Sequence, residues 1–395
     1  MTKSTEAFIN HQLLIWARKN AGLNLEQASK KAGVPEERLA SWESGQNRPT
    51  INQLRKLANA YKRPLAVFYL PTPPRDFQPL RDYRQLTAGP HEPESPGLLL
   101  AVRRAWAQRE IAIELYRNIE EKPPQFPVAT TTTDEPEVLA LRIRNELGIS
   151  QETQTGFVSK YEAFNWWRDS LESKGILVFQ AAEVDISEMR GFSLTDRPLP
   201  VVVVNIKDSP LARIFSMLHE LAHVSIRQGG VCDLDEFGQR CPAEQQIETF
   251  CNRVAGAILI PKQELLAEKL VMERPSGPTV WLDEDIFLLA RRYWVSQEVL
   301  ARRLLICGLV TKEFYLEKRA QFRAKKIPSD KGFAPPAQMA ISVSGNALVR
   351  LVLDNYYREH ITSSDVSDFL NVKLKHLGKT EQKAMGHRLL FGAVA

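Results

Sequence analysis

The sequence has little cysteine and no long apolar run, and each shortage excludes a class of protein. Its four cysteines, Cys232, Cys241, Cys251 and Cys307, are too few and too scattered along 395 residues for a disulfide framework, so we expect reduced thiols. No stretch approaches the roughly 18 consecutive apolar residues of a membrane-spanning helix, and the first residues lack the apolar centre of a secretion signal. We therefore expect a cytoplasmic protein without a membrane partner.

The sequence also lacks a strong excess of charge of either sign. The formal net charge is +5, and 44% apolar and 25% charged residues are ordinary globular values, which excludes general disorder. The positive charge is concentrated in residues 1–70, which hold eleven Lys or Arg against five Asp or Glu. This local charge of +6 leaves −1 for the other 325 residues, so a polyanion would meet the N-terminal part.

Helix signals dominate the first seventy residues. Four short apolar stripes are separated by turn residues, which predicts a small all-α bundle. Gly33 is placed to end the second helix, Pro35 to begin the third and Thr50 to cap the fourth.

The rest of the chain is mainly helical, with strands confined to one region. Apolar runs at 176–180 and 199–205 predict buried strands, and 189–194 predicts a third, more exposed one. Proline clusters mark the boundaries between segments. We expect a multidomain chain: a helical bundle at 1–70, a proline-rich connector with a long helix at 71–133, an α+β core at 134–265, a helical region at 266–325, and a C-terminal helical segment at 326–395.

The segment SPLARIFSMLHELAHVSIRQGG at 209–230 carries the most specific pattern. Ser209 and Pro210 favour a helix start, and Gly229–Gly230 favours a stop. His219 and His223 then lie one turn apart on one face, about 5–6 Å from each other, which suits two imidazoles on one tetrahedral ion. Glu220 is placed to take a proton from attacking water while the metal polarises a scissile carbonyl.

A third protein ligand is needed if the fourth position is to hold water. The extended metzincin pattern is excluded, because Ile226 and Gly229 occupy its Gly and His positions. A carboxylate from the predicted helix at 244–261 is the alternative, and Glu248 is the expected ligand. Glu244, one turn earlier, is a second choice. We interpret Cys251 as a packed thiol; a thiolate lid formed by Cys232 and Cys241 is a weaker alternative.

The segments RIFSMLHELAH at 213–223 and ETFCNRVAGAILIP at 248–261 resemble the ImmA/IrrE family of metallopeptidases, which carry HELxH and a downstream ExxAN. Cys251 stands where the family usually has Ala. The resemblance implies a zincin-like α+β core with Zn²⁺ on His219, His223 and Glu248, and Glu220 as general base. It also implies limited proteolysis of a regulatory protein, such as a repressor or antitoxin.

Residues 10–65 resemble the helix-turn-helix domain of the Xre and lambda-repressor group, with the turn SWESGQNRPT as the most specific part. The resemblance implies that a helix at 35–42 enters the major groove of DNA. The sequence departs from good DNA readers at Leu25, Glu36 and Glu37, so a protein-docking or autoinhibitory module is the alternative. The expected DNA contacts are Arg38, Ser41, Arg48, Lys62 and Arg63.

Two further segments invite functional hypotheses. The strand at 189–194, centred on Phe192, is a candidate sheet edge for an extended substrate, although an interior strand explains the pattern equally well. Residues 295–315, with Arg302, Arg303 and Lys312, look like a second helix-turn-helix. We expect that segment to serve structure or substrate docking rather than DNA reading.

The leading hypothesis is therefore a zinc endopeptidase that cuts a repressor or antitoxin and is coupled to transcription through an N-terminal DNA-binding domain. Its rival is a transcription factor whose peptidase-like domain senses a ligand or metal, or only docks a partner, without proteolysis. Glu220 favours the enzyme, because a sensor needs metal ligands but has no requirement for a base.

Overall fold

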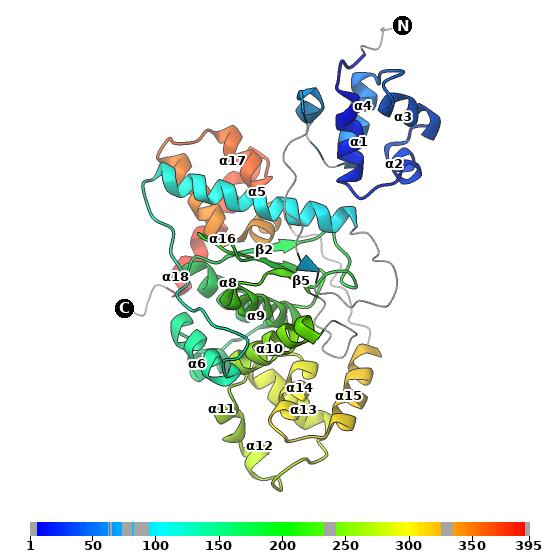
Figure 1. Ribbon diagram of the computed structural model, residues 1–395. Coiled ribbons are helices and arrows are strands. Elements are labelled where there is room, and N and C mark those ends of the chain that lie inside the picture. Colours follow the sequence, from blue (N-terminus) through cyan, green and yellow to red (C-terminus); the bar gives the residue numbers. More distant parts are fainter. Residues whose placement is uncertain are drawn as a thin grey trace. The chain divides into compact units, whose positions relative to one another are not determined.

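The computed structural model describes residues 6–61, 63, 65–72, 81–82, 95–232, 242–324 and 335–391 (Figure 1). The chain divides into two compact units, residues 1–79 with 89–104 and residues 80–88 with 105–395. The second division falls inside the long helix α5 (Pro96–Asn118). Among the described helices, none combines the length and apolarity that a membrane crossing requires.

The N-terminal unit contains the predicted bundle of short helices. Gly33 ends α2 in the left-handed conformation at φ 65°, and Thr50 exchanges side-chain and backbone hydrogen bonds with Gln53, as a capping residue does. A turn of three residues separates α2 from α3, which begins after Pro35. The elements are α1 (His11–Lys19), α2 (Leu25–Ala32), α3 (Glu36–Glu43), α4 (Ile51–Tyr61) and a 3₁₀ turn at Leu65–Tyr69.

A half-buried ion pair fixes α3 against α1. The Arg18 guanidinium donates to both carboxylate oxygens of Glu43, at 2.7 and 2.8 Å. This hydrogen bonding raises the pKa of Arg18 and outweighs the opposing effect of its burial. The pair therefore sets the orientation of the predicted recognition helix within the bundle.

A mixed five-stranded sheet forms the centre of the second unit, in the order β1-β5-β3-β4-β2. β4 runs parallel to β2 and antiparallel to β3, which is itself antiparallel to β5. β1 lies parallel to β5 at the far side. The strands are β1 (Arg81–Asp82), β2 (Leu177–Ala181), β3 (Gly191–Leu194), β4 (Val201–Asn205) and β5 (Gly230–Cys232).

The expected exposed edge strand at 189–194 is wrong in its placement. β3 pairs with β4 on one side and β5 on the other, every residue of it is buried, and Phe192 is fully enclosed. Because both of its neighbours use its backbone groups, β3 is not available for an added peptide strand.

Helices α8 and α9 pack against the sheet, and α10 packs along α9 (Figure 1). One continuous core of buried side chains extends from Phe126 to Val310. The boundary expected at 265 therefore does not separate two cores. The remaining helices are α6 (Pro136–Leu147), α7 (Gln151–Thr155), α8 (Lys160–Ser173), α9 (Pro210–Ile226), α10 (Pro242–Leu259), α11 (Lys262–Leu266), α12 (Lys269–Met272), α13 (Asp283–Arg292), α14 (Gln297–Ile306), α15 (Lys312–Ala324), α16 (Pro336–Tyr357), α17 (Ser363–Leu370) and α18 (Leu377–Phe391), with a 3₁₀ turn at Leu374–His376.

The second helix-turn-helix-like segment corresponds to α14 and α15, and its arginines face the core. Arg303 is 1% exposed, pairs with Glu137 at 2.7 Å and donates to the Ile260 carbonyl at 2.7 Å. Arg302 is also buried and donates to the Tyr315 hydroxyl. These contacts support the structural role and leave neither guanidinium at the surface for DNA.

The C-terminal segment docks on the sheet through an interruption in α16. Gly345 breaks the helix at φ 75° and ψ 162°, a backbone region that is essentially restricted to glycine. There the Glu172 carboxylate accepts from the Ala347 amide at 2.8 Å, and burial raises the pKa of Glu172 to about 8. Thr362 and Asp365 form a capping box at the start of α17.

We predict that Gly345→Ala destabilises the protein by about 3–5 kcal/mol, the sum of a disallowed backbone conformation and an overpacked contact. An added Cβ would lie 2.2 Å from Glu172 Oε1 and 2.7 Å from the Val178 carbonyl oxygen. Urea unfolding followed by tryptophan fluorescence measures the effect. Gly148→Ala is the matched control, since Gly148 has φ 69° but nothing within 4 Å, and should cost only about 1–2 kcal/mol. Equal midpoints for the two variants would contradict the prediction.

Candidate metal centre

Helix α9 begins as predicted and ends differently. The Ser209 side chain accepts from the Ala212 amide, and Pro210 occupies the first helical position. Arg227, rather than a glycine, takes the left-handed conformation at the C-terminus, at φ 57°. All residues from Arg213 to Ile226 are buried, so α9 passes through the core and holds its side chains rigidly.

Three buried side chains converge at the middle of α9. His219 Nε2 and His223 Nε2 lie 3.1 Å apart. Glu248 of α10 completes the group, with its Oε2 3.4 Å from His219 Nε2 and its Oε1 3.2 Å from His223 Nε2. All three side chains are 0% exposed, and their ligand atoms lie within 4.8 Å of one another. Glu244, the alternative from the sequence, is not part of this cluster.

The far side of each imidazole is held by an acceptor. His219 Nδ1 donates to Asn252 Oδ1 at 3.0 Å, and His223 Nδ1 donates to the Gln228 carbonyl at 2.8 Å. Because Nδ1 carries the proton in this arrangement, the lone pair of each Nε2 is directed toward Glu248 and the other imidazole. Asn252 and Gln228 therefore fix the tautomer that a metal ligand requires.

The donor set fits a zinc ion. Zinc bonds of about 2.0–2.2 Å at tetrahedral angles would place neighbouring ligand atoms about 3.3–3.6 Å apart. The three separations here are 3.1, 3.2 and 3.4 Å. Burial acts to raise the pKa of Glu248, but imidazoles of His219 and His223 that carry a proton toward it outweigh burial and hold the pKa below its usual range. A bound cation would take the place of these protons, opposite the Nε2 lone pairs. An ionised carboxylate opposite two imidazole lone pairs is a suitable site for a divalent cation.

Glu220 lies beside this group and is held by β3. Its Oε2 accepts from the Ser193 hydroxyl at 2.9 Å, while its Oε1 has no hydrogen-bond partner among the described residues. Gly191 leaves room for the carboxylate, since a Cβ there would approach Oε1 to 3.1 Å. Burial raises the pKa of Glu220, against the opposing effect of the two imidazoles and the Ser193 hydrogen bond. A carboxyl with a raised pKa suits general base catalysis near neutral pH.

Sequence reasoning missed three of these side-chain and backbone groups. Ser193, Asn252 and Gln228 contact Glu220, His219 and His223 respectively. The one usable signal for Asn252 is its spacing from Glu248, because residues four apart on α10 face the same side.

The cysteines near the centre behave as follows. Cys251 is fully buried, and burial raises the pKa of its thiol, which agrees with a packed neutral group. The alternative lid of Cys232 and Cys241 falls outside the described part of the chain, which includes neither Cys241 nor the side chain of Cys232.

The predicted DNA contacts lie in the N-terminal unit. Arg38 is exposed on α3, and the Ser41 hydroxyl donates to the Arg38 carbonyl at 2.8 Å. The Arg48 and Arg63 guanidiniums stack on the rings of Phe8 and Trp16, each 4.3 Å from the ring centroid. Lys62 lies outside the described residues.

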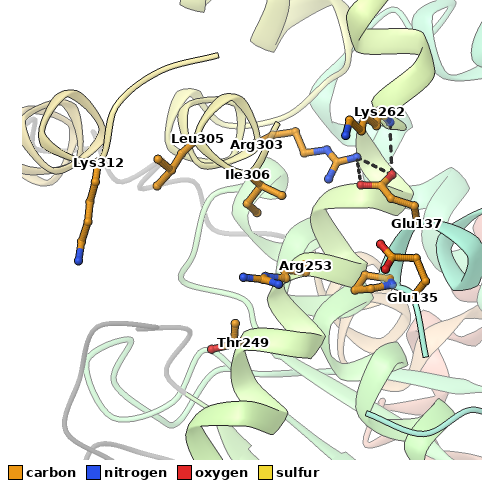
Figure 2. A pocket seen from close by; sticks show the side chains of 10 residues that line it. Glu135, Glu137, Thr249, Arg253, Lys262, Arg303, Leu305, Ile306 and Lys312 are labelled. Carbon is orange, nitrogen blue, oxygen red and sulfur yellow. Dashed lines mark hydrogen bonds and ion pairs between the residues drawn. The ribbon is translucent and has the colours of Figure 1, made fainter. Parts of the chain in front are cut away.

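A separate pocket of about 580 Å³ is lined in part by α10. Figure 2 shows Thr249 and Arg253, which follow Glu248 and Asn252 in sequence, among its lining residues together with Lys262 and Lys312. The Arg303–Glu137 pair closes one wall. None of the three clustered side chains lines this cavity, so it does not serve the metal centre directly.

Comparison with known proteins finds a family model that matches part of each unit. Residues 171–305 match the peptidase family model described as the IrrE N-terminal-like domain, and residues 14–68 match the model described as helix-turn-helix. The resemblance expected from the sequence is thereby confirmed. The first match begins within α8 and runs to α14, beyond the segment that carries the metal motif. No curated protein and no solved structure matches the chain.

We predict that Asn252→Ala weakens zinc binding about 10- to 100-fold, because His219 loses the acceptor that fixes its ring. Competition against a zinc-chelating dye measures the dissociation constant. Asn252→Asp keeps an acceptor oxygen and should bind closer to the unsubstituted protein. Thr249→Ala, on the outer face of the same helix, controls for changes in α10 itself. Indistinguishable affinities for the two Asn252 variants would refute the role of this hydrogen bond.

Proposed function

We propose that the IrrE N-terminal-like domain at residues 171–305 is a zinc-dependent endopeptidase that cuts a regulatory protein, a repressor or an antitoxin, at limited sites. We further propose that the helix-turn-helix domain at residues 14–68 couples this cleavage to transcription. The observation that carries the proposal is the buried group of His219, His223 and Glu248 with Glu220 beside it.

The burial of this group supports an active role rather than a structural accident. Two imidazoles and two carboxyls at 0% exposure would be costly to desolvate without a shared partner. A structural zinc site normally uses four protein ligands, whereas three ligands with an adjacent carboxyl are typical of a hydrolytic site. The arrangement therefore favours catalysis over scaffolding.

Each residue has a definite part in the proposed reaction. Zinc held by His219, His223 and Glu248 would polarise the scissile carbonyl and acidify water at a fourth position. Glu220 takes a proton from that water as the water oxygen bonds to the carbonyl carbon. The Glu220 carboxyl then returns the proton to the amide nitrogen as the C–N bond breaks, which yields a new carboxyl end and a new amino end. Ser193 holds Oε2 and leaves Oε1 for this transfer.

We propose a protein substrate rather than a small molecule because the chain also contains a helix-turn-helix domain. A helix-turn-helix domain in the same chain brings the peptidase to DNA, or to proteins that occupy DNA. The rival function is a regulator in which the peptidase-like domain binds a metal or a partner without cutting. The position of Glu220, buried and held by Ser193 beside the cluster, favours the enzyme.

We predict that co-expression with the products of neighbouring genes yields defined fragments of one of them, detected by mass spectrometry. Glu220→Gln should abolish the fragments while zinc stoichiometry stays at one, because the ligands are unchanged and only the base is lost. Glu248→Gln should lose both zinc and cleavage.

Glu244→Gln is the matched control, since it alters a carboxyl on the same helix one turn from Glu248 and should cut normally. Fragments produced equally by the unsubstituted chain and by Glu220→Gln would rule out the mechanism. Full zinc loading without fragments from any neighbouring product would favour the sensor.

DNA binding by the N-terminal domain is proposed through α3 and its flanking cations. The local charge of residues 1–70 and the exposure of Arg38 and Arg48 support contact with a polyanion. Against this, Glu36 and Glu37 open α3 with two exposed carboxylates. These carboxylates oppose phosphate and accept only from cytosine amino groups, which weakens general affinity.

We predict binding to duplex DNA from the promoter of the chain's own gene, with an affinity that falls steeply between about 50 and 200 mM salt. Arg48→Ala should weaken binding to all sequences and lower the slope of log affinity against log salt by about one. Glu37→Gln should strengthen binding by removing a repulsive charge. Fluorescence anisotropy at several salt concentrations measures all three proteins. Absence of binding at the lowest salt would instead favour a protein-docking module.

A further inference from the structure

The strand β5 begins at the metal centre. Between α9 and β5 lie only three residues, of which Arg227 ends the helix and Gln228 accepts from His223 through its carbonyl. Gly229 then passes against the Ser193 carbonyl, where an added Cβ would approach the oxygen to 2.3 Å. The backbone that enters β5 is therefore in contact with a metal ligand on one side and with β3 on the other.

The strand β3 separates β5 from the rest of the sheet and flanks Glu220. Gly191 and Ser193 both contact or adjoin the Glu220 carboxylate, and Gly191 is paired with Cys232 of β5. β5 is consequently the next strand outward from the strand that holds the candidate base. Its outer edge, on the side away from β3, is the nearest place at which an extended peptide could join the sheet beside the candidate metal centre.

The opposite edge of the sheet is closed. β2 is the last strand on that side, and α16 packs against it. Gln180 of β2 donates to the Ser342 carbonyl, and the interrupted backbone at Gly345 lies close to the Val178 carbonyl oxygen. Within the described residues, a new strand can therefore be added only on the β5 side.

That side is occupied by the chain's own connector. β1 pairs with β5 in parallel, with Arg81 opposite Gly230 and Asp82 opposite Val231. β1 comes from the proline-rich segment between the helix-turn-helix domain and α5. Arg and Asp do not favour strands, and the ladder is only two residues long, so the pairing rests on a few backbone hydrogen bonds.

We propose that the connector strand β1 occupies the edge of β5 that an extended polypeptide substrate uses, so that substrate and connector compete for it. One strand edge pairs with one partner at a time, because each backbone N–H and C=O directed outward is used once. In the absence of substrate, β1 then occupies the peptide-binding edge of β5, and a substrate binds there by displacing β1. This inference rests on the proposed endopeptidase function and adds its regulation.

The experiment uses the full chain with Glu220→Gln, so that bound peptide is not cut. Arg81→Pro/Asp82→Pro removes the backbone donors of β1, while Arg81→Ala/Asp82→Ala keeps them and serves as the matched control. Hydrogen–deuterium exchange is followed in fragments covering residues 228–232. Fluorescence anisotropy measures binding of a labelled peptide with the sequence of residues 76–87, DFQPLRDYRQLT.

We expect the proline pair to speed exchange at β5 about tenfold and to bind the peptide about tenfold more tightly than the alanine pair, as a few lost ladder hydrogen bonds imply. Unchanged exchange in the proline pair overturns the proposal, because β1 then does not protect β5. Faster exchange without peptide binding overturns it too, because the freed edge does not accept a peptide.

Neither hydrogen–deuterium exchange nor peptide binding needs hydrolysis. A failure of the competition proposal is therefore distinct from a failure of the proposed endopeptidase function. Equal zinc stoichiometry in the two double variants verifies that the metal centre has kept its structure. If both expected effects are seen but co-expression yields no fragments, the competition between β1 and a peptide stands and the proposed peptidase function is wrong.

Discussion

The structure of the second unit depends on placing two imidazoles and a carboxylate at one buried point. These groups come from α9 and α10, and their ligand atoms lie within 4.8 Å of one another at 0% exposure. Such an arrangement is unfavourable unless the charges are compensated, because desolvation of a carboxylate and two lone pairs costs several kcal/mol. A divalent cation would supply that compensation. The apolar residues around α9 then have two effects. They form part of the core, and by excluding water they strengthen the electrostatic interactions between the groups of this site.

The surrounding backbone serves this centre in detail. Gln228 and Asn252 orient the imidazoles, and Ser193 orients the base from β3. Gly191 and Gly229 allow the carboxylate and the chain entering β5 to come close to their neighbours. Asn252 joins α9 to α10, and Ser193 and Gly191 both join α9 to β3. The sheet and α10 thus surround His219, Glu220, His223 and Glu248 and hold these four side chains in position.

Local patterns carried most of the sequence prediction. The spacing of His219 and His223 and the position of Glu248 on the next helix are properties of single helices, which is why the sequence alone indicates them. The placement of β3 could not, because its four residues alternate as an edge strand would, while its partner β5 has only three residues and gives almost no signal. Pairing across a sheet is a tertiary property, and short strands specify it weakly.

The glycines after α9 illustrate a second limit. Gly229 and Gly230 favoured a helix stop, yet Arg227 takes the left-handed position and Gly229 is used for close approach to Ser193. Glycine has two uses, positive φ and close packing, and a sequence does not tell them apart. For the same reason the sequence does not predict the role of Gly345. That role depends on close approach to Glu172 and Val178, which are distant in the chain.

The C-terminal segment is tied to the metal helix by a buried polar path. Arg213, two turns before His219, donates to Gln180 of β2, and Gln180 donates to the Ser342 carbonyl of α16. Burial lowers the pKa of Arg213 to about 10, and its guanidinium stacks on Phe164 at 4.6 Å. Because a buried guanidinium needs all its partners, α16 cannot leave β2 without weakening the support of α9. The segment that closes one edge of the sheet therefore also stabilises the helix that bears the candidate metal ligands, whereas the other edge is held only by two connector residues.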